Sequence, residues 1–422
     1  MQFGGTNNPE SLIAAAKIFH SHLRVAFFTD SYLEVNGVAM TSKRLESFAR
    51  RRSLPFLTVY GGAKNSNTQS GSVEQLELKR SPLAIPMDAG LAYDPLFQRH
   101  APFVKSKLEE FRPDVIHITG LNDVSVLGAW LSNKLQIPVL ASWHTNIHEF
   151  AATRLPQVLR FMPQNARQKL IGVIERNILA GAVWYYKVGK VVLAPNQELV
   201  DLLHRGTGRE ARLMIRGVDP KAFSPAKRTV QDNIFRFGFC GRLQPEKNVR
   251  LLVEIEKGLM AAGKTDYKFL IVGDGSERAW LEQNLKRAEF TGFIEGERLS
   301  EAYANMDAFV FPSETDTFGN VVQEAFASGV PAIVASAGGP KFIVKHGKTG
   351  FVAENTTDFV RYSLNLIDNP AQHQMMSRAA RDFALSRSWD SVFEAVYQAY
   401  DECLKVPPVR KVNQKATVVS IS

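Results

Sequence analysis

The chain has 422 residues, of which 45% are hydrophobic and 22% charged, and its formal net charge is +9. This length exceeds the roughly 250–300 residues that one hydrophobic core supports, so we expect two domains. The two cysteines, Cys240 and Cys403, exclude a disulfide framework and a thiolate zinc cluster, and they favour a reducing cytoplasm.

The first twenty residues lack the basic and apolar regions of a signal peptide. No apolar run approaches the roughly 20 residues that span a bilayer. We therefore expect a cytoplasmic protein that is neither secreted by that route nor integral, with an N-terminal extension over 1–22. The positive charge calls for an acidic partner, which could be nucleic acid, an anionic membrane surface or the diphosphate of a substrate.

The N-terminal half alternates short apolar runs with amphipathic segments. This alternation, with crossovers of helical length, predicts a parallel, doubly wound sheet in a first domain over 23–215. The predicted strands are 23–30, 55–61, 114–120, 138–145 and 191–195, and the predicted helices are 37–52, 96–111, 122–136 and 150–183.

A turn-rich segment, 216–229, is typical of a linker and is a plausible hinge before a second doubly wound domain, 216–388. An amphipathic helix over 389–405 follows that domain, and 406–422 is predicted to be a flexible tail. The two domains should face each other across a cleft. In the second domain the predicted strands are 235–241, 268–274, 290–294, 308–313 and 331–336, and the predicted helices are 248–262, 276–288, 298–306 and 319–328.

Residues 151–190 carry seven basic side chains against one acid, Glu175, interleaved with apolar and aromatic residues. That mixture suits a helix lying in a membrane interface. The alternative is an amphipathic helix pair whose apolar side packs on its own domain.

Two carboxylates mark the segment 313–340. Asp316 lies in the loop after a predicted buried strand, and Glu324 follows about two helical turns later. Helix N-termini at strand ends direct free N–H groups outward, and carboxylates accept hydrogen bonds from sugar hydroxyls. The pair therefore suits a ligand that carries a ribose and a hexose. The alternative is that Asp316 caps the helix and Glu324 is a solvated surface residue.

Three other motifs follow predicted strands. GRLQPEKN holds Arg242 and Lys247, which could stabilise a departing diphosphate without a metal. In NGVAMTSKRL, Gly37 allows backbone N–H groups to approach phosphates closely. SWHTNIH places His144 at a strand end facing the cleft. The alternatives are a solvated basic turn, a simple turn glycine and a structural histidine.

On these motifs, above all TDTFGNVVQEA and FTDSYLEVNGVAMTSKRL, the chain resembles the retaining, sugar-nucleotide-dependent glycosyltransferases that include sucrose synthases and phosphatidylinositol mannosyltransferases. The sequence of these motifs is most similar to that of the members that use GDP-mannose and act on glycolipid acceptors. The family hallmark is a Glu, seven residues and a second Glu. This chain keeps the second as Glu324 but has Asp316 at the first, which could alter donor choice.

The resemblance implies the GT-B fold, in which two Rossmann-like domains face a cleft and the last helix crosses back onto the first. It implies transfer of a hexose with retention, without a metal, to a lipid-linked or glycan acceptor bound mainly by the first domain. A lipid-linked acceptor would suit the basic, aromatic segment 151–190, and we therefore expect a peripheral position on the inner face of the cytoplasmic membrane. The implied roles are a phosphate-binding pair (Arg242, Lys247), a phosphate-approaching glycine (Gly37), a histidine beside the transferred sugar (His144), backbone that meets the nucleobase (Phe293, Ile294), a ribose ligand (Glu324) and hexose ligands in the loop (Asp316, Thr317, Phe318, Gly319, Asn320, Val321).

Several alternatives stay open. Phe293 could equally be a core aromatic. The donor could be a UDP-sugar, and the enzyme could be a non-hydrolysing sugar-nucleotide epimerase. Because Asp316 departs from the hallmark, an inactive sugar-nucleotide-binding protein is a further possibility. Outside these classes, the charge fits a basic nucleic-acid-binding protein, although the sequence contains no recognised nucleic-acid module.

Overall fold

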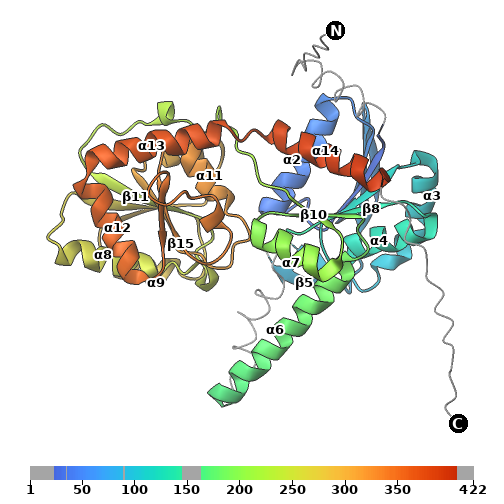
Figure 1. The fold of residues 1–422 in the computed structure, drawn as a ribbon, viewed down its shortest axis with the longest axis horizontal. Coiled ribbons are helices and arrows are strands. Elements are labelled where there is room, and N and C mark those ends of the chain that lie inside the picture. The colour runs from blue at the N-terminus through green and yellow to red at the C-terminus, as the bar shows by residue number, and fades with distance from the viewer. Residues whose placement is uncertain (1–22, 35, 89–90, 145–162, 406–422) are drawn as a thin grey trace, which may run out of the picture.

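The computed structural model describes residues 23–34, 36–88, 91–144 and 163–405, which form two α/β domains lying side by side (Figure 1). The predicted extension 1–22, the predicted tail 406–422 and the start of the predicted helix 150–183 lie outside the described residues. Within the described ranges, no helix has the length and apolar character needed to cross a membrane.

The first domain contains an eight-stranded sheet in the order β10-β9-β8-β7-β1-β2-β4-β3. Neighbouring strands run parallel except β3, which pairs antiparallel with β4 and forms one edge. A two-stranded hairpin, β5 and β6, stands apart from this sheet. The strands are β1 Val25–Thr29, β2 Phe56–Gly62, β3 Ser66–Ser70, β4 Val73–Lys79, β5 Ile85–Asp88, β6 Leu91–Tyr93, β7 Val115–Ile118, β8 Val139–Ser142, β9 Val191–Ala194 and β10 Glu210–Leu213.

Both faces of this sheet are buried, and β1 shows how. Val25 and Phe27 belong to one apolar cluster, which includes residues of α2 (Gly37–Arg51) and α14 (Trp389–Lys405), whereas Ala26 and Phe28 belong to a second cluster on the opposite face. The separation follows from the two-residue period of strand side chains. The helices of this domain are α2 Gly37–Arg51, α3 Ala101–Phe111, α4 Asp123–Leu135, α6 Gln164–Tyr186 and α7 Gln197–Thr207.

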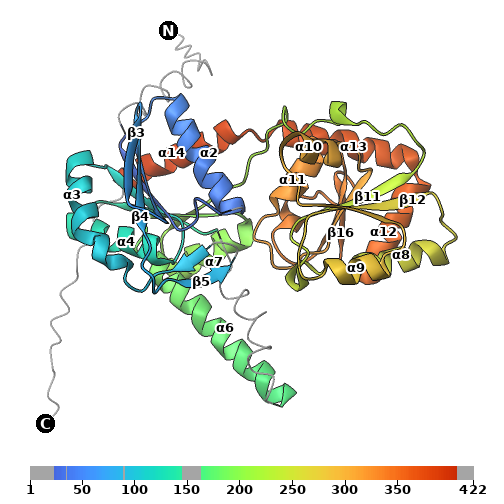
Figure 2. The same cartoon turned by 180° about the vertical axis from the view of Figure 1, so that it is seen from behind.

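The second domain contains a six-stranded parallel sheet in the order β13-β12-β11-β14-β15-β16. Helices α10, α11 and α13 lie on one side of this sheet and α8, α9 and α12 on the other (Figure 2). The elements are β11 Phe235–Cys240, α8 Leu251–Ala261, β12 Tyr267–Val272, α9 Arg278–Asn284, β13 Ala288–Gly292, α10 Gly296–Ala304, β14 Ala308–Phe311, α11 Asn320–Ala327, β15 Ala332–Ala335, β16 Gly350–Ala353, α12 Thr356–Asp368 and α13 Pro370–Leu385.

Two segments cross between the domains, next to each other. A Cβ added to Gly217 would lie 2.6 Å from the backbone nitrogen of Trp389, the first residue of α14 (Trp389–Lys405). Helix α14 then packs on the first sheet. Val218 and Phe223 are buried in the core of the second domain. Most of the segment 216–229 that was predicted as a linker is therefore packed against that domain.

Several element boundaries were predicted wrongly. The predicted strand 290–294 is β13, Ala288–Gly292, and it ends where Gly292 adopts φ +70°. The predicted helix 276–288 is only α9, because the chain extends again before β13. A 3₁₀ turn, Phe97–His100, precedes α3 within the predicted helix 96–111. The pattern also missed the β3 and β4 hairpin, which turns at Gly71 with φ +62°.

Candidate active site

The loop after β14 contains the first predicted carboxylate. The Nζ atom of Lys247 lies 2.7 Å from both carboxylate oxygens of Asp316. Both side chains are largely buried, with 14% and 24% of their surface exposed. Burial raises the pKa of Asp316, but the charge and hydrogen bonds of Lys247 outweigh this effect, so the pKa lies below its usual value. Asp316 is therefore ionised and oriented.

The second carboxylate is held on α11. The phenolic oxygen of Tyr303 donates to Glu324 Oε2 at 2.8 Å. Burial raises the pKa of Glu324 to about 7, against the lowering effects of Tyr303 and of Arg44 on α2. Arg44, Asn320 and Glu324 line one small hollow between the domains. Neither carboxylate fits the alternative of a helix cap and a solvated surface residue, because Gly319 is the N-cap residue of α11 and Glu324 is half-buried.

The loop also contacts the first domain directly. Thr317 Oγ1 donates to the backbone oxygen of His144 at 3.0 Å, and Asn196 Nδ2 donates to the backbone oxygen of Thr317 at 2.9 Å. Gly37 opens α2 opposite this loop, and a Cβ there would lie 2.9 Å from Asn320 Nδ2. The structure therefore brings Gly37, His144, Asp316 and Asn320 to one interdomain boundary.

His144 is buried after β8, and both of its ring nitrogens have partners. Nε2 lies 2.7 Å from Ser142 Oγ, and Nδ1 faces the guanidinium of Arg216. Burial lowers the pKa of His144 well below its usual value, and the charge of Arg216 adds to this effect. The imidazole is therefore neutral near pH 7. His148, the other histidine of the motif, lies outside the described residues.

The remaining predicted residues differ in exposure. Arg242 follows β11, has 43% of its side chain exposed and lies 3.6 Å from Glu246. Phe293 is 63% exposed, which excludes the core-aromatic alternative, whereas Ile294 packs against the second core. In the loop, Phe318 is buried, Val321 packs on the core, and Gly319 has φ +91°, a conformation that side chains with a Cβ disfavour.

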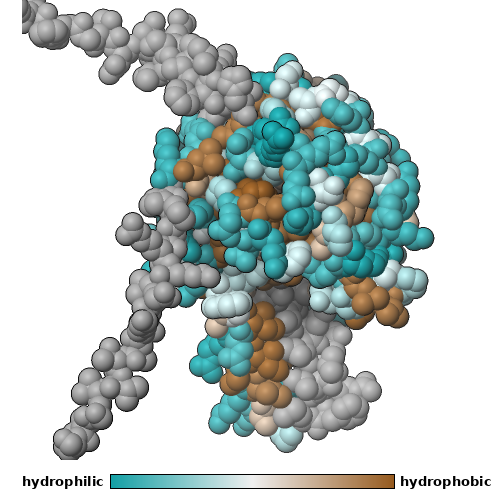
Figure 3. Space-filling model, turned by 90° about the vertical axis from the view of Figure 1, so that its right-hand side faces the viewer, coloured by the Kyte–Doolittle hydropathy of each residue, from teal (hydrophilic) through white to brown (hydrophobic). Residues whose placement is uncertain are grey.

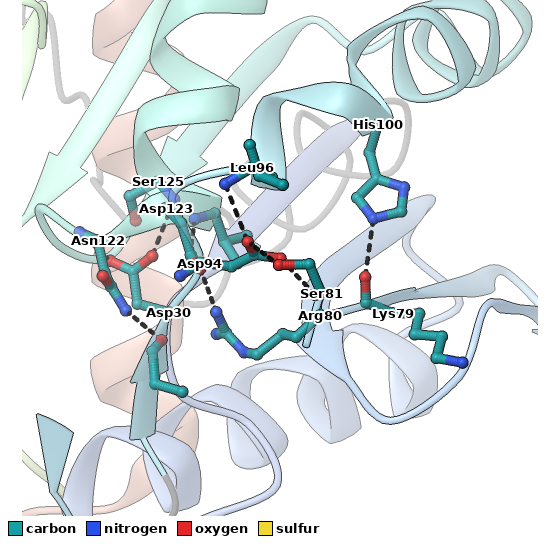
Figure 4. A network of polar contacts seen from close by, with 12 residues as sticks. Asp30, Lys79, Arg80, Ser81, Asp94, Leu96, His100, Asn122, Asp123 and Ser125 are labelled. Atoms are coloured by element: carbon teal, nitrogen blue, oxygen red, sulfur yellow. Dashed lines mark hydrogen bonds and ion pairs between the residues drawn. The ribbon is translucent and has the colours of Figure 1, made fainter. Parts of the chain in front are cut away.

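A polar network lies at the carboxyl ends of the first-domain strands (Figure 4). Asp30 follows β1 and accepts hydrogen bonds from the backbone nitrogens of Asn122 and Ser125 at 3.1 and 2.9 Å. Burial raises the pKa of Asp30 to about 6. Nearby, Arg80 pairs with Asp123. Charged groups therefore gather at the carboxyl ends of the first-domain strands.

Sequence reasoning missed the residues that hold this site together. Asn196 follows the predicted strand 191–195, Arg216 lies in the predicted linker, and Tyr303 lies in the predicted helix 298–306. The position of Asn196 just after a buried strand was a usable signal, since ligand-site residues gather there in parallel sheets. Arg216 and Tyr303 gave none, because their contacts join segments that are distant in sequence.

Comparison with known proteins gives the site its context. Residues 221–383 match the family described as glycosyl transferases group 1, and residues 61–222 match glycosyltransferase family 4. The chain is 30% identical over 403 residues to the GDP-mannose-dependent alpha-mannosyltransferase of Mycobacterium tuberculosis, an alignment that covers 90% of this chain and 96% of that protein.

Two further proteins resemble this chain at lower sequence identity. The alpha-monoglucosyldiacylglycerol synthase of Acholeplasma laidlawii is 24% identical over 286 residues, covering 63% of this chain and 69% of that protein. The solved sucrose-phosphate synthase of Thermosynechococcus elongatus superposes with a TM-score of 0.69 at 18% identity, covering 91% of this chain and 99% of that one. This likeness and the two parallel sheets confirm the predicted fold class. The chain thus belongs to the glycosyltransferases of the GT-B fold.

Proposed function

We propose that the protein transfers mannose from GDP-mannose to a lipid-linked or glycan acceptor, with retention of the anomeric configuration and without a metal. The contact that carries this proposal is the Lys247 and Asp316 pair, which stands where the loop after β14 meets His144. The similarity to a GDP-mannose-dependent alpha-mannosyltransferase supports the choice of donor.

In this proposal, Arg242 and Lys247 bind the diphosphate, and backbone N–H groups near Gly37 approach it from the first domain. Glu324 accepts hydrogen bonds from the ribose. The backbone around Phe293 and Ile294 contacts the nucleobase. Asp316 and the backbone of Thr317 to Asn320 hold the hexose. His144 contributes a hydrogen bond to a hexose hydroxyl.

Retention follows if the acceptor attacks the face from which the diphosphate departs. The acceptor oxygen forms a bond to the anomeric carbon as the bond to the diphosphate oxygen breaks, and that phosphate oxygen takes the acceptor's proton. The developing negative charge needs cations that are already in place. The side chains of Arg242 and Lys247 supply that charge in this proposal, so we expect turnover to persist in the presence of EDTA.

A membrane contact through α6 would suit a lipid acceptor. The helix projects from the first domain, and a stripe of hydrophobic side chains runs along it (Figure 3). Leu170, Val173 and Trp184 are exposed on it, and Trp184 has 70% of its surface exposed. Exposed apolar side chains among basic ones favour an anionic membrane surface. Residues 151–162, the start of the predicted membrane-binding region 151–190, lie outside the described residues.

The test is an assay of the purified protein with GDP-mannose, UDP-glucose or UDP-galactose, each with and without lipid and glycan acceptors. We expect an α-linked mannosyl product from GDP-mannose only when acceptor is present, and NMR identifies the anomer. Turnover only with a UDP-sugar would instead identify a UDP-sugar-dependent glycosyltransferase of the same fold.

The same assay separates an epimerase, an inactive binding protein and a nucleic-acid-binding protein. An epimerase would convert the donor without any acceptor, and an inactive protein would bind the donor without transfer. A nucleic-acid-binding protein would bind DNA or RNA with strong salt dependence.

A further inference from the structure

A buried arginine stands where the chain first crosses between the domains. Arg216 follows β10 by three residues, and only 4% of its surface is exposed. Burial lowers the pKa of its guanidinium to about 10, which still leaves it protonated near neutral pH. The protein therefore holds a full positive charge next to His144.

This charge has no acidic partner among the described residues. One terminal nitrogen, Nη2, donates to His144 Nδ1, and the other, Nη1, is buried without a hydrogen-bond partner in that part of the chain. His144 is neutral, so it does not compensate the charge. Burying a cation without a counter-charge opposes folding.

A second buried arginine shows the usual arrangement. Arg236 is 8% exposed, and its two terminal nitrogens lie 2.6 and 2.7 Å from the two carboxylate oxygens of Asp232. Arg216 departs from that arrangement, because no carboxylate of the described residues pairs with it. A bound anionic ligand would supply the counter-charge.

The surroundings of Arg216 indicate which anion this is. Its partner His144 accepts a hydrogen bond from Thr317 in the loop of Asp316. The next residue, Gly217, lines the same hollow as Asn320 and Glu324. Arg216 is therefore next in sequence to a residue that lines the place proposed for the nucleotide sugar, whose diphosphate is its anionic part.

We propose that Arg216 is a third diphosphate-binding cation of the donor site, in addition to Arg242 and Lys247. This inference rests on the proposed function, because it takes the ligand of the cleft to be a nucleoside diphosphate sugar. Arginine suits the role, since its planar guanidinium can form two parallel hydrogen bonds to a phosphate.

The contact with His144 adds a consequence. A guanidinium only donates, so His144 Nδ1 accepts and Nε2 carries the proton toward Ser142 Oγ. Both nitrogens are occupied while Arg216 points at the ring. Movement of Arg216 to the diphosphate would free Nδ1 to accept a hydrogen bond from a hexose hydroxyl.

The test measures binding of GDP and UDP by isothermal titration to the wild type, Arg216→Met, Arg216→Lys and the control Arg236→Met. We expect Arg216→Met to lower the affinity for the better-bound nucleotide at least tenfold. The affinity of Arg216→Lys should lie between those of Arg216→Met and the wild type. Arg236→Met should lower the Tm, because it leaves Asp232 unpaired, yet keep the nucleotide affinity within twofold of the wild type.

Unchanged nucleotide affinity in Arg216→Met would overturn the role of Arg216 while leaving the proposed function intact. If that variant does not fold, Arg216→Lys decides, because its single ammonium cannot reproduce the two-pronged contact, and wild-type affinity would then overturn the inference. A wild type that binds neither nucleotide would overturn both proposals.

Discussion

Lys247 and Asp316 form an ion pair in which one ammonium nitrogen lies 2.7 Å from both oxygens of the carboxylate. The pair joins the turn after β11 to the loop after β14. These two strands are neighbours in the second sheet. Each of these residues is proposed to bind the donor. The ion pair therefore keeps the two binding groups in place before the ligand arrives.

Replacing Lys247 with Met should weaken GDP-mannose binding by about ten- to a hundredfold. The loss corresponds to one charge-assisted hydrogen bond, about 1.5–3 kcal/mol. Isothermal titration measures the effect, and Lys257→Met, which changes an exposed lysine on α8, is the control. Equal affinities in the two variants would show that Lys247 does not touch the donor.

Glu324 should make the empty protein less stable as the pH rises. Its pKa is about 7 in the folded state and about 4.5 ordinarily. Between these two pH values, the folded state therefore holds a proton on Glu324 that the unfolded state has lost. Stability from this group is complete below about pH 4.5 and is lost as the pH rises through 7. Glu324→Gln should therefore exceed the wild type in stability at pH 8, by on the order of 2 kcal/mol. The difference should shrink toward pH 5. Urea unfolding at both pH values measures it, and a constant difference would contradict the assignment.

The same carboxylate should make donor binding depend on pH in the opposite sense. An ionised Glu324 is the stronger acceptor for ribose hydroxyls, so the affinity for GDP-mannose should increase from pH 5.5 to pH 8. Both phosphates of GDP-mannose stay ionised over this range, and His144 stays neutral because its pKa is far lower. Titrations at several pH values test this, and Glu324→Gln should show a flat profile. A sloping profile in that variant would assign the dependence to another group.

The sequence predicted the two parallel sheets because their strands are short apolar runs with helices between them. It predicted Gly37, His144 and Asp316 as site residues because each follows a strand. Their assembly depends on contacts that local patterns do not encode, such as Thr317 with His144 and Asn196 with Thr317. The β3 strand was missed because Ser66–Ser70 is an exposed polar edge with no hydrophobic alternation.

Gly37→Ala should separate stability from donor binding. The new methyl group would lie 2.9 Å from Asn320 Nδ2, the end of a side chain that can rotate away, so the Tm should change by no more than about 2–4 °C. The methyl group would nevertheless obstruct the approach of the diphosphate to the start of α2, and we expect at least a tenfold loss of affinity. Thermal unfolding and isothermal titration give the two values. Gly172→Ala, on α6 with open space around it, should alter neither. Wild-type affinity in Gly37→Ala would place the diphosphate elsewhere.

Phe393 should account for much of the stability that α14 gives to the first domain. Its side chain is fully buried, and its ring centroid lies 5.6 Å from that of Phe48 on α2 and 5.3 Å from that of Trp389. Phe393→Ala leaves a cavity between α14 and α2 and should cost about 3–5 kcal/mol. Leu404→Ala, at an exposed position of the same helix, should cost no more than about 0.5 kcal/mol. Chemical denaturation of both variants measures the costs.

Because Gly217 packs against Trp389, loosening α14 should also disturb the segment around Gly217 that first crosses between the domains, and it should raise the KM for the donor. Equal stability of the two variants would mean that α14 contributes little to the first domain.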